Sequence, residues 1–137
     1  MVSLPAGIVL VVDDDAAVRV ALQRLLVRAG MSVVTATDTR EAIAATREHG
    51  GKLSAVIVDL GLGKEDGAML VRHLRRRRPG LGIVIFSGNA EGAIRQDLLT
   101  LGVRDYIVKP APLPRIVDAV RRAIGPDGEP CPDGPAV

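Results

Sequence analysis

The sequence predicts an α/β fold, a parallel sheet of five strands with helices packed on its faces. Five short apolar runs alternate with segments of helical spacing, as in chains built from strand-helix units. The runs are residues 8–12, 32–35, 55–58, 83–86 and 105–108. The 137 residues are also 47% hydrophobic but only 1% aromatic. We therefore expect one domain with a core of Val, Leu, Ile and Ala.

The first predicted helix follows the first strand. Apolar residues between Val18 and Ala29 recur at the i, i+3, i+4 and i+7 positions of one helix face, and Arg19 is expected to point away from that face. Asp15 suits the N-cap of this helix, and Gly30 suits its end.

Start signals also mark the second and third helices. Asp38 is followed three residues later by Glu41, which is a capping-box pattern, and glycines at residues 50–51 end the segment. The third helix is expected to begin near Glu65 or Asp66, because negative charges complement the positive end of a helix dipole.

Four consecutive arginines, residues 75–78, close the third helix before Pro79. A nucleic-acid interface is one interpretation of this run. A solvated helix end is the better one, because consecutive residues point around a helix and cations near its C-terminus complement the dipole. The net charge of +2, from 18 basic and 16 acidic residues, gives nucleic-acid binding no further support. No direct nucleic-acid contact is expected.

The last two helices differ in apolar content. Residues 90–101 carry few large apolar side chains, so this fourth helix is expected to be more mobile than the first. Residues 114–124 carry apolar side chains at helical spacing and are expected to pack on the sheet. The folded domain is expected to cover residues 1–124, and residues 125–137, rich in Pro and Gly, to form a disordered tail or linker.

Cysteine content and hydropathy bear on location. The single cysteine, Cys131, excludes an intramolecular disulfide and a cysteine-based metal site. The N-terminus lacks the basic region of a signal peptide, and no apolar run approaches the ~18 residues that would span a membrane. A cytoplasmic protein without a membrane partner is expected.

Polar residues stand where four of the five strands end. They are Asp13, Asp14 and Asp15 after the first strand, Asp59 after the third, Ser87 after the fourth, and Lys109 with Pro110 after the fifth. Open α/β sheets place their sites at the carboxyl ends of the strands. If the strand order is 2-1-3-4-5, Asp13 and Asp14 lie beside Asp59.

This set suits phosphoryl chemistry. Three neighbouring carboxylates repel one another unless a cation lies among them, and oxygen ligands favour Mg²⁺ or Mn²⁺. A carboxylate such as Asp59 beside a divalent cation can attack a phosphoryl group, while Lys109 and Ser87 contact its oxygens. Taken singly, Asp59 suits a loop cap, Ser87 a turn and Lys109 a solvated strand end. Their joint occurrence at the strand ends favours the functional interpretation.

With these residues, the chain resembles the receiver domains of response regulators in bacterial two-component signalling, over about residues 7–124. The matching segments are Val11-Val12-Asp13-Asp14-Asp15, Val58-Asp59-Leu60, Phe86-Ser87-Gly88, Tyr106 and Lys109-Pro110. The resemblance implies a flavodoxin-like (βα)5 fold, a three-layer sandwich with strand order 2-1-3-4-5. It also implies a signalling module rather than an enzyme.

The resemblance assigns the metal and the phosphoacceptor. It implies that Asp59 accepts a phosphoryl group from a histidine kinase or histidine phosphotransfer protein. Asp14 would bind Mg²⁺ directly, Asp13 would assist through water, and the Gly61 backbone carbonyl would be a further ligand.

The resemblance also assigns a switch. Ser87 and Lys109 would bind the phosphoryl group, and Tyr106 would swing inward as Ser87 moves onto the phosphate. The Lys109-Pro110 bond would be cis. A downstream protein would then bind the surface of the fourth helix, fifth strand and fifth helix, with a homodimer as an open alternative.

Two positions bear on how long a phosphoryl group would last, and a third bears on metal binding. Gly61 and Asn89 occupy places that modulate dephosphorylation in such domains, and the missing side chain at Gly61 leaves room for water. Gly63 stands where the family usually has proline, so a looser loop and weaker metal binding are expected.

Two alternative functions compete with that of a phosphoacceptor. A degenerate receiver that acts only as an interaction scaffold would lack part of the site, but no position of the set is missing. A metal-dependent phosphohydrolase would need a second carboxylate two residues after Asp59, where this chain has Gly61, and an inserted cap for its substrate.

Overall fold

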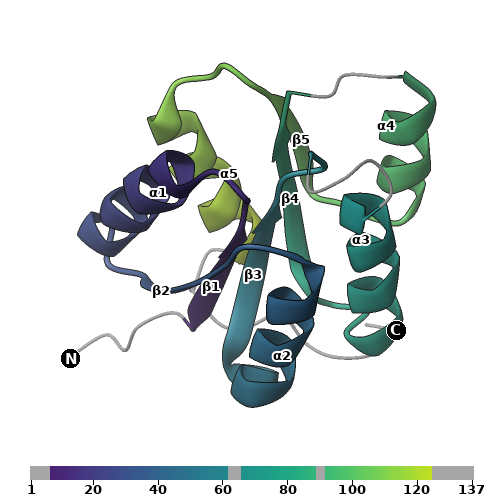
Figure 1. Cartoon of the computed structure of the whole chain (residues 1–137), viewed down its shortest axis with the longest axis horizontal. Helices are drawn as coiled ribbons and strands as arrows, with labels where there is room; N and C mark the ends of the chain where they lie inside the picture. The colour runs from purple at the N-terminus through teal and green to yellow at the C-terminus, as the bar shows by residue number, and fades with distance from the viewer. Residues whose placement is uncertain (1–6, 62–65, 89–91, 125–137) are drawn as a thin grey trace.

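The computed structural model describes residues 7–61, 66–88 and 92–124. They form a five-stranded parallel sheet in the order β2-β1-β3-β4-β5. Helices cover both faces of this sheet in the three-layer arrangement of flavodoxin-like proteins (Figure 1). The predicted fold and strand order are therefore confirmed.

The elements alternate strictly along the chain. The strands are β1 (Ile8–Val12), β2 (Ser32–Ala36), β3 (Leu53–Val58), β4 (Gly82–Ser87) and β5 (Asp105–Val108). The helices are α1 (Ala16–Arg28), α2 (Thr39–His49), α3 (Asp66–Arg77), α4 (Gly92–Thr100) and α5 (Leu113–Ile124), with a 3₁₀ turn at Gly50–Lys52. Three strands run one or two residues past the apolar runs, because parallel pairing continues through polar and glycine residues such as Ser87 and Gly82.

The core has two halves, one on each face of the sheet. Helices α1 and α5 pack on one face and α2, α3 and α4 on the other (Figure 1). Side chains of β1 alternate between them, with Val9 and Val11 toward α1 and α5, and Leu10 and Val12 toward the opposite helices. Every residue of β3 and β4 is buried, as expected for central strands covered on both sides.

The predicted capping signals act as caps. Asp15 Oδ1 accepts a hydrogen bond from the backbone N–H of Ala17 at 2.9 Å, and Asp38 caps α2 in the same way. Gly30 follows α1 with φ at 95°, a conformation that favours glycine. The expectation for Arg19 was wrong, because its guanidinium turns back to donate to the Asp13 carbonyl at 2.7 Å.

The arginine run is not a uniformly solvated helix end. Arg76 and Arg77 are exposed, whereas Arg75 and Arg78 turn back to cap backbone carbonyls. The acceptors of Arg75 include Leu101, Leu81 and Gly102 at 2.8, 3.0 and 3.1 Å, and those of Arg78 include Gly50 and Leu53 at 2.7 and 3.1 Å. Two of the four arginines therefore hold the ends of neighbouring elements together.

In the part of helix α4 whose burial is described, residues 95–100, Leu98 is the one buried residue, and Leu99 is 42% exposed. The greater mobility of this helix stays a prediction. The predicted tail at residues 125–137, including Cys131, lies outside the described residues. Among the residues that are described, no helix has the length and hydropathy to cross a bilayer.

Candidate functional site

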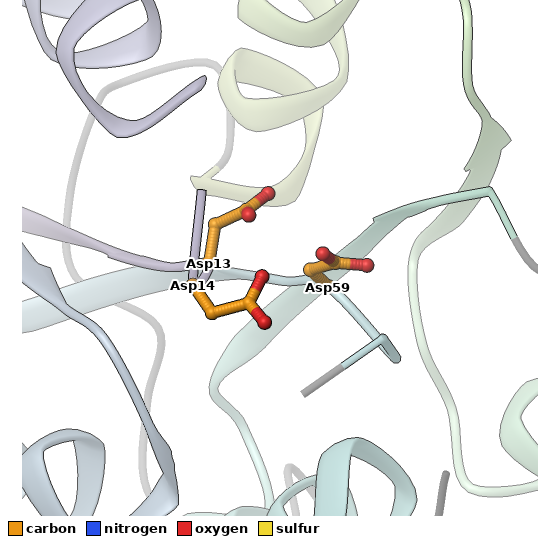
Figure 2. Close-up of side chains that lie close together, drawn as sticks. All are labelled: Asp13, Asp14 and Asp59. Atoms are coloured by element: carbon orange, nitrogen blue, oxygen red, sulfur yellow. The ribbon is translucent and has the colours of Figure 1, made fainter. Parts of the chain in front are cut away.

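The parallel register brings Asp13 and Asp59 together. Val12 of β1 pairs with Val58 of β3, so the residue after each strand lies at the same edge of the sheet. The backbone N–H of Asp59 donates to the Val12 carbonyl at 3.0 Å, which extends this pairing by one step. With Asp14, the two form a cluster in which one carboxylate oxygen from each residue lies within 4.8 Å of the others (Figure 2).

The three carboxylates differ in exposure. Asp13 and Asp59 are 2% and 6% exposed, whereas Asp14 is open to solvent. Backbone groups hold the two buried carboxylates: Asp13 Oδ1 accepts from the N–H of Asp15 at 2.9 Å, and Asp59 Oδ1 from the N–H of Gly61 at 3.0 Å. Backbone hydrogen bonds thus fix the carboxylates of Asp13 and Asp59, and solvent reaches the cluster at Asp14.

Lys109 lies between the two buried carboxylates. Its Nζ is 2.9 Å from Asp13 Oδ2 and 3.3 Å from Asp59 Oδ2. It follows β5, whose pairing with β4 continues in a hydrogen bond from the Lys109 N–H to the Ser87 carbonyl at 2.9 Å. The ammonium also stands 5.2 Å from the centre of the Phe86 ring. A cation of the chain itself therefore offsets part of the carboxylate repulsion.

The pKa values of Asp13 and Lys109 are both raised. Burial raises the pKa of Asp13 above 3.8, against the opposing effects of its hydrogen bonds from Asp15 and Lys109. For Lys109, burial alone would lower the pKa, but the hydrogen bond to Asp13 and the charges of Asp13 and Asp59 raise it above 10.5. Lys109 is accordingly charged at neutral pH.

The carboxylate cluster fits a hard divalent cation. Its donors are all oxygens, two of them on buried and preoriented side chains, and the exposed Asp14 leaves a side open to water. The residues that would hold the ion are Asp13, Asp14 and Asp59. No side chain stands at Gly61, where a Cβ would lie 3.3 Å from Asp59 Oδ1 and would narrow the approach to that carboxylate.

The other predicted site residues lie on β4, on β5 and directly after β5. Ser87 ends β4 and is 1% exposed, and the Lys109-Pro110 peptide bond is cis. Tyr106 of β5 is 4% exposed, so its ring is inside the domain, and the Arg95 guanidinium of α4 stands 5.1 Å from the ring centre. Two positions, Gly63 and Asn89, lie outside the described residues.

Sequence reasoning missed two arginines near the site. Arg19 holds the backbone at Asp13, and Arg95 covers Tyr106. Arg19 stands one helical turn after the N-cap Asp15, so its return to the strand end has a signal in the spacing. The sequence holds no such signal for Arg95, because its partner Tyr106 lies on β5 and the contact depends on how α4 packs against the sheet.

Comparison with known proteins places this geometry in a family. Residues 9–121 match the family model described as the response regulator receiver domain. The DNA-binding transcriptional regulator NtrC of Salmonella typhimurium is 32% identical over 118 residues. That match covers 86% of this chain and 25% of NtrC, so the chain spans about a quarter of the length of this relative.

Two solved structures resemble the chain in fold and sequence. A response regulator receiver protein from Pseudomonas putida is 32% identical with a TM-score of 0.79, covering 88% of this chain and 99% of that one. A response regulator from Burkholderia pseudomallei, solved with a phosphorylated aspartic acid, calcium ion and citrate, is 30% identical with a TM-score of 0.74 and covers 84% and 66%. The chain belongs to the response regulator receiver domain family of two-component signalling.

Proposed function

We propose that Asp59 is the phosphoacceptor of this receiver domain and that its phosphorylation switches the binding of a protein partner. The observation that carries the proposal is the position of the Asp59 carboxylate. It lies at the end of a buried strand, 3.3 Å from the Lys109 ammonium and beside two further carboxylates. The phosphorylated aspartic acid of the Burkholderia pseudomallei relative supports the same chemistry.

The residues divide the reaction between them. A carboxylate oxygen of Asp59 attacks phosphorus while the bond to the donor breaks, and the leaving group departs with its electron pair. Lys109 exchanges its contact with Asp59 for a phosphoryl oxygen, and the Ser87 hydroxyl donates to another. A bound Mg²⁺ or Mn²⁺ would neutralise charge on the phosphoryl oxygens, and Asp13, Asp14, Asp59 and the Gly61 carbonyl would hold it.

We assign the donor to a histidine kinase or histidine phosphotransfer protein. The output surface in this proposal is formed by α4, β5 and α5, because Ser87 and Tyr106 connect the site to it. Arg95 on α4 contacts Tyr106 and supports that connection. Homodimerisation and a cytoplasmic location belong to the same proposal.

The open side of the site predicts a short-lived phosphoryl group. Because Gly61 presents no side chain next to the Asp59 carboxylate, water has room to attack the acyl phosphate. Asn89 is proposed as a second modulator of this rate. At Gly63, the more permissive backbone would weaken metal affinity.

The direct test is intact mass after incubation with acetyl phosphate, with and without Mg²⁺. One phosphoryl adduct that requires Mg²⁺ is expected for the wild-type chain, and none for Asp59→Asn. Asp118→Asn, which alters an exposed carboxylate on α5, is the matched control and should be phosphorylated normally. An adduct that persists in Asp59→Asn would refute the assignment, and no adduct on folded wild-type protein that binds Mg²⁺ would favour the scaffold alternative.

A further inference from the structure

A second polar site lies away from the carboxylate cluster, where the C-terminal ends of α2 and α3 meet. The cleft there has a volume of about 300 Å³ and is lined by Thr46, Arg47, Gly50, His73, Leu74, Arg77 and Arg78. This volume is at the small end of the range of about 300–1,000 Å³ for ligand pockets. No carboxylate of the described residues lines the cleft, so its charge is entirely basic.

The arginines of this cleft are not equivalent. Arg78 is engaged, because its guanidinium donates to the carbonyls of Gly50 and Leu53 at 2.7 and 3.1 Å. Those bonds occupy carbonyls at the end of α2 and the start of β3. Across the described parts of the chain, neither Arg47 nor Arg77 makes a hydrogen bond or an ion pair. Two exposed arginines without a partner among the described residues therefore line the cleft.

The pKa of His73 is lowered by burial and by the arginine charges around the cleft. Burial lowers its pKa below 6.5, and the charges of Arg77, Arg47 and Arg76 lower it further. The neighbouring lining groups, Thr46 and Leu74, carry no charge that would offset this effect. The positive charges of Arg47, Arg76 and Arg77 therefore all act on the surroundings of His73, which favours a bound anion there.

We propose that this cleft binds a small phosphate-bearing molecule, with Arg47 and Arg77 contacting the phosphate oxygens. Guanidinium groups bind phosphate through two parallel N–H donors, and two such groups match its several acceptors better than they match a single carboxylate. The small volume and the apolar lining residue Leu74 suit a small ligand. The site is separate from Asp59 and adds ligand sensing to the proposed phosphoacceptor function.

The two histidines of the chain, His49 and His73, make a local test practical. Ring signals would be followed by NMR in the full chain without Mg²⁺, during titration with pyrophosphate, ADP or adenosine. Pyrophosphate and ADP should shift the His73 signal to saturation and raise the pKa of His73, because a bound anion screens the arginine charges. Adenosine, which lacks phosphate, should leave the signal unchanged.

Arginine variants connect the binding to the cleft. Because a hydrogen bond to a charged group is worth about tenfold in affinity, Arg47→Gln with Arg77→Gln should weaken pyrophosphate binding about a hundredfold. Arg24→Gln with Arg28→Gln is the charge-matched control, since it removes two exposed arginines from α1 on the opposite face of the sheet. Asp59→Asn should bind pyrophosphate as the wild type does.

Several outcomes would overturn the proposal. These are an unchanged His73 signal at saturating pyrophosphate, an equal loss of affinity in Arg24→Gln with Arg28→Gln, or equal binding of adenosine. Binding that requires a polyanion such as DNA, with none for pyrophosphate, would also overturn it and would show a macromolecular surface in its place. Loss of the site in Asp59→Asn would assign the binding to the carboxylate edge instead.

Discussion

Replacing Lys109 by methionine tests the electrostatics of the carboxylate cluster. The change keeps the aliphatic stem but removes the ammonium that lies 2.9 Å from Asp13 Oδ2 and 3.3 Å from Asp59 Oδ2. Two nearly buried carboxylates then face each other without their cation. We expect Lys109→Met to lower the free energy of unfolding at pH 7.

The size of the loss follows from the burial of the pair. Removing one partner of a fully buried ion pair costs about 3–5 kcal/mol, because the other charge stays buried. The Lys109 side chain is 24% exposed, so water screens part of this interaction and the expected loss is about 2–3 kcal/mol. Adding Asp13→Asn should recover part of that loss, since the two sites are directly coupled.

Urea unfolding with and without Mg²⁺ measures both effects. A bound divalent cation would compensate the carboxylate charges in place of Lys109, so Mg²⁺ should stabilise Lys109→Met by more than it stabilises the wild type. At a Mg²⁺ concentration a hundredfold above Kd, binding would stabilise the folded protein by about 2.7 kcal/mol. Lys52→Met, at an exposed lysine, is the control and should be neutral. A loss below ~0.5 kcal/mol, in the range of ordinary surface substitutions, would refute the electrostatic reasoning.

Three further predictions concern residues away from the carboxylate cluster. Arg75→Met should lower the free energy of unfolding in urea by about 2–3 kcal/mol, because carbonyls such as that of Leu101 lose a charged donor. The control Arg76→Met, at an exposed arginine, should change it by no more than ~0.5 kcal/mol. Equal effects of the two substitutions would contradict the capping role of Arg75. Gly82→Ala should cost about 1–3 kcal/mol, since its Cβ would lie 2.7 Å from the Ala123 carbonyl oxygen, and an unchanged thermal midpoint would show that α5 yields easily. His73→Gln should flatten the dependence of the free energy of unfolding on pH. Folding lowers the pKa of His73 from 6.5, so the stability that His73 contributes is fully present above pH 6.5 and is lost as the pH falls through its folded-state pKa. Unfolding at pH 7.5 and 5.5 measures that slope, and a slope identical to that of the wild type would exclude His73 as its source.

Local sequence determined the elements of this fold. A strand buried on both faces must be apolar along its length, and a helix must repeat its apolar residues every three to four positions, so both leave a signature in the chain. Capping residues such as Asp15 and Asp38 accept hydrogen bonds from backbone N–H groups two or three residues later, so the sequence predicts them as well. Since parallel strands share one carboxyl edge, the approach of Asp13 and Asp59 also followed once the strand order was known.

Tertiary structure decided the partners of the charged side chains. Lys109 lies 96 residues from Asp13 and 50 from Asp59 along the chain, and the sequence suggested a phosphate contact for it rather than this ion pair. Within the arginine run, only the packing of the neighbouring loops separates Arg75 and Arg78, which cap carbonyls, from Arg77, which faces the basic cleft. Long, flexible charged side chains carry no periodicity of their own, so their roles depend on which distant backbone or charge the fold brings within reach.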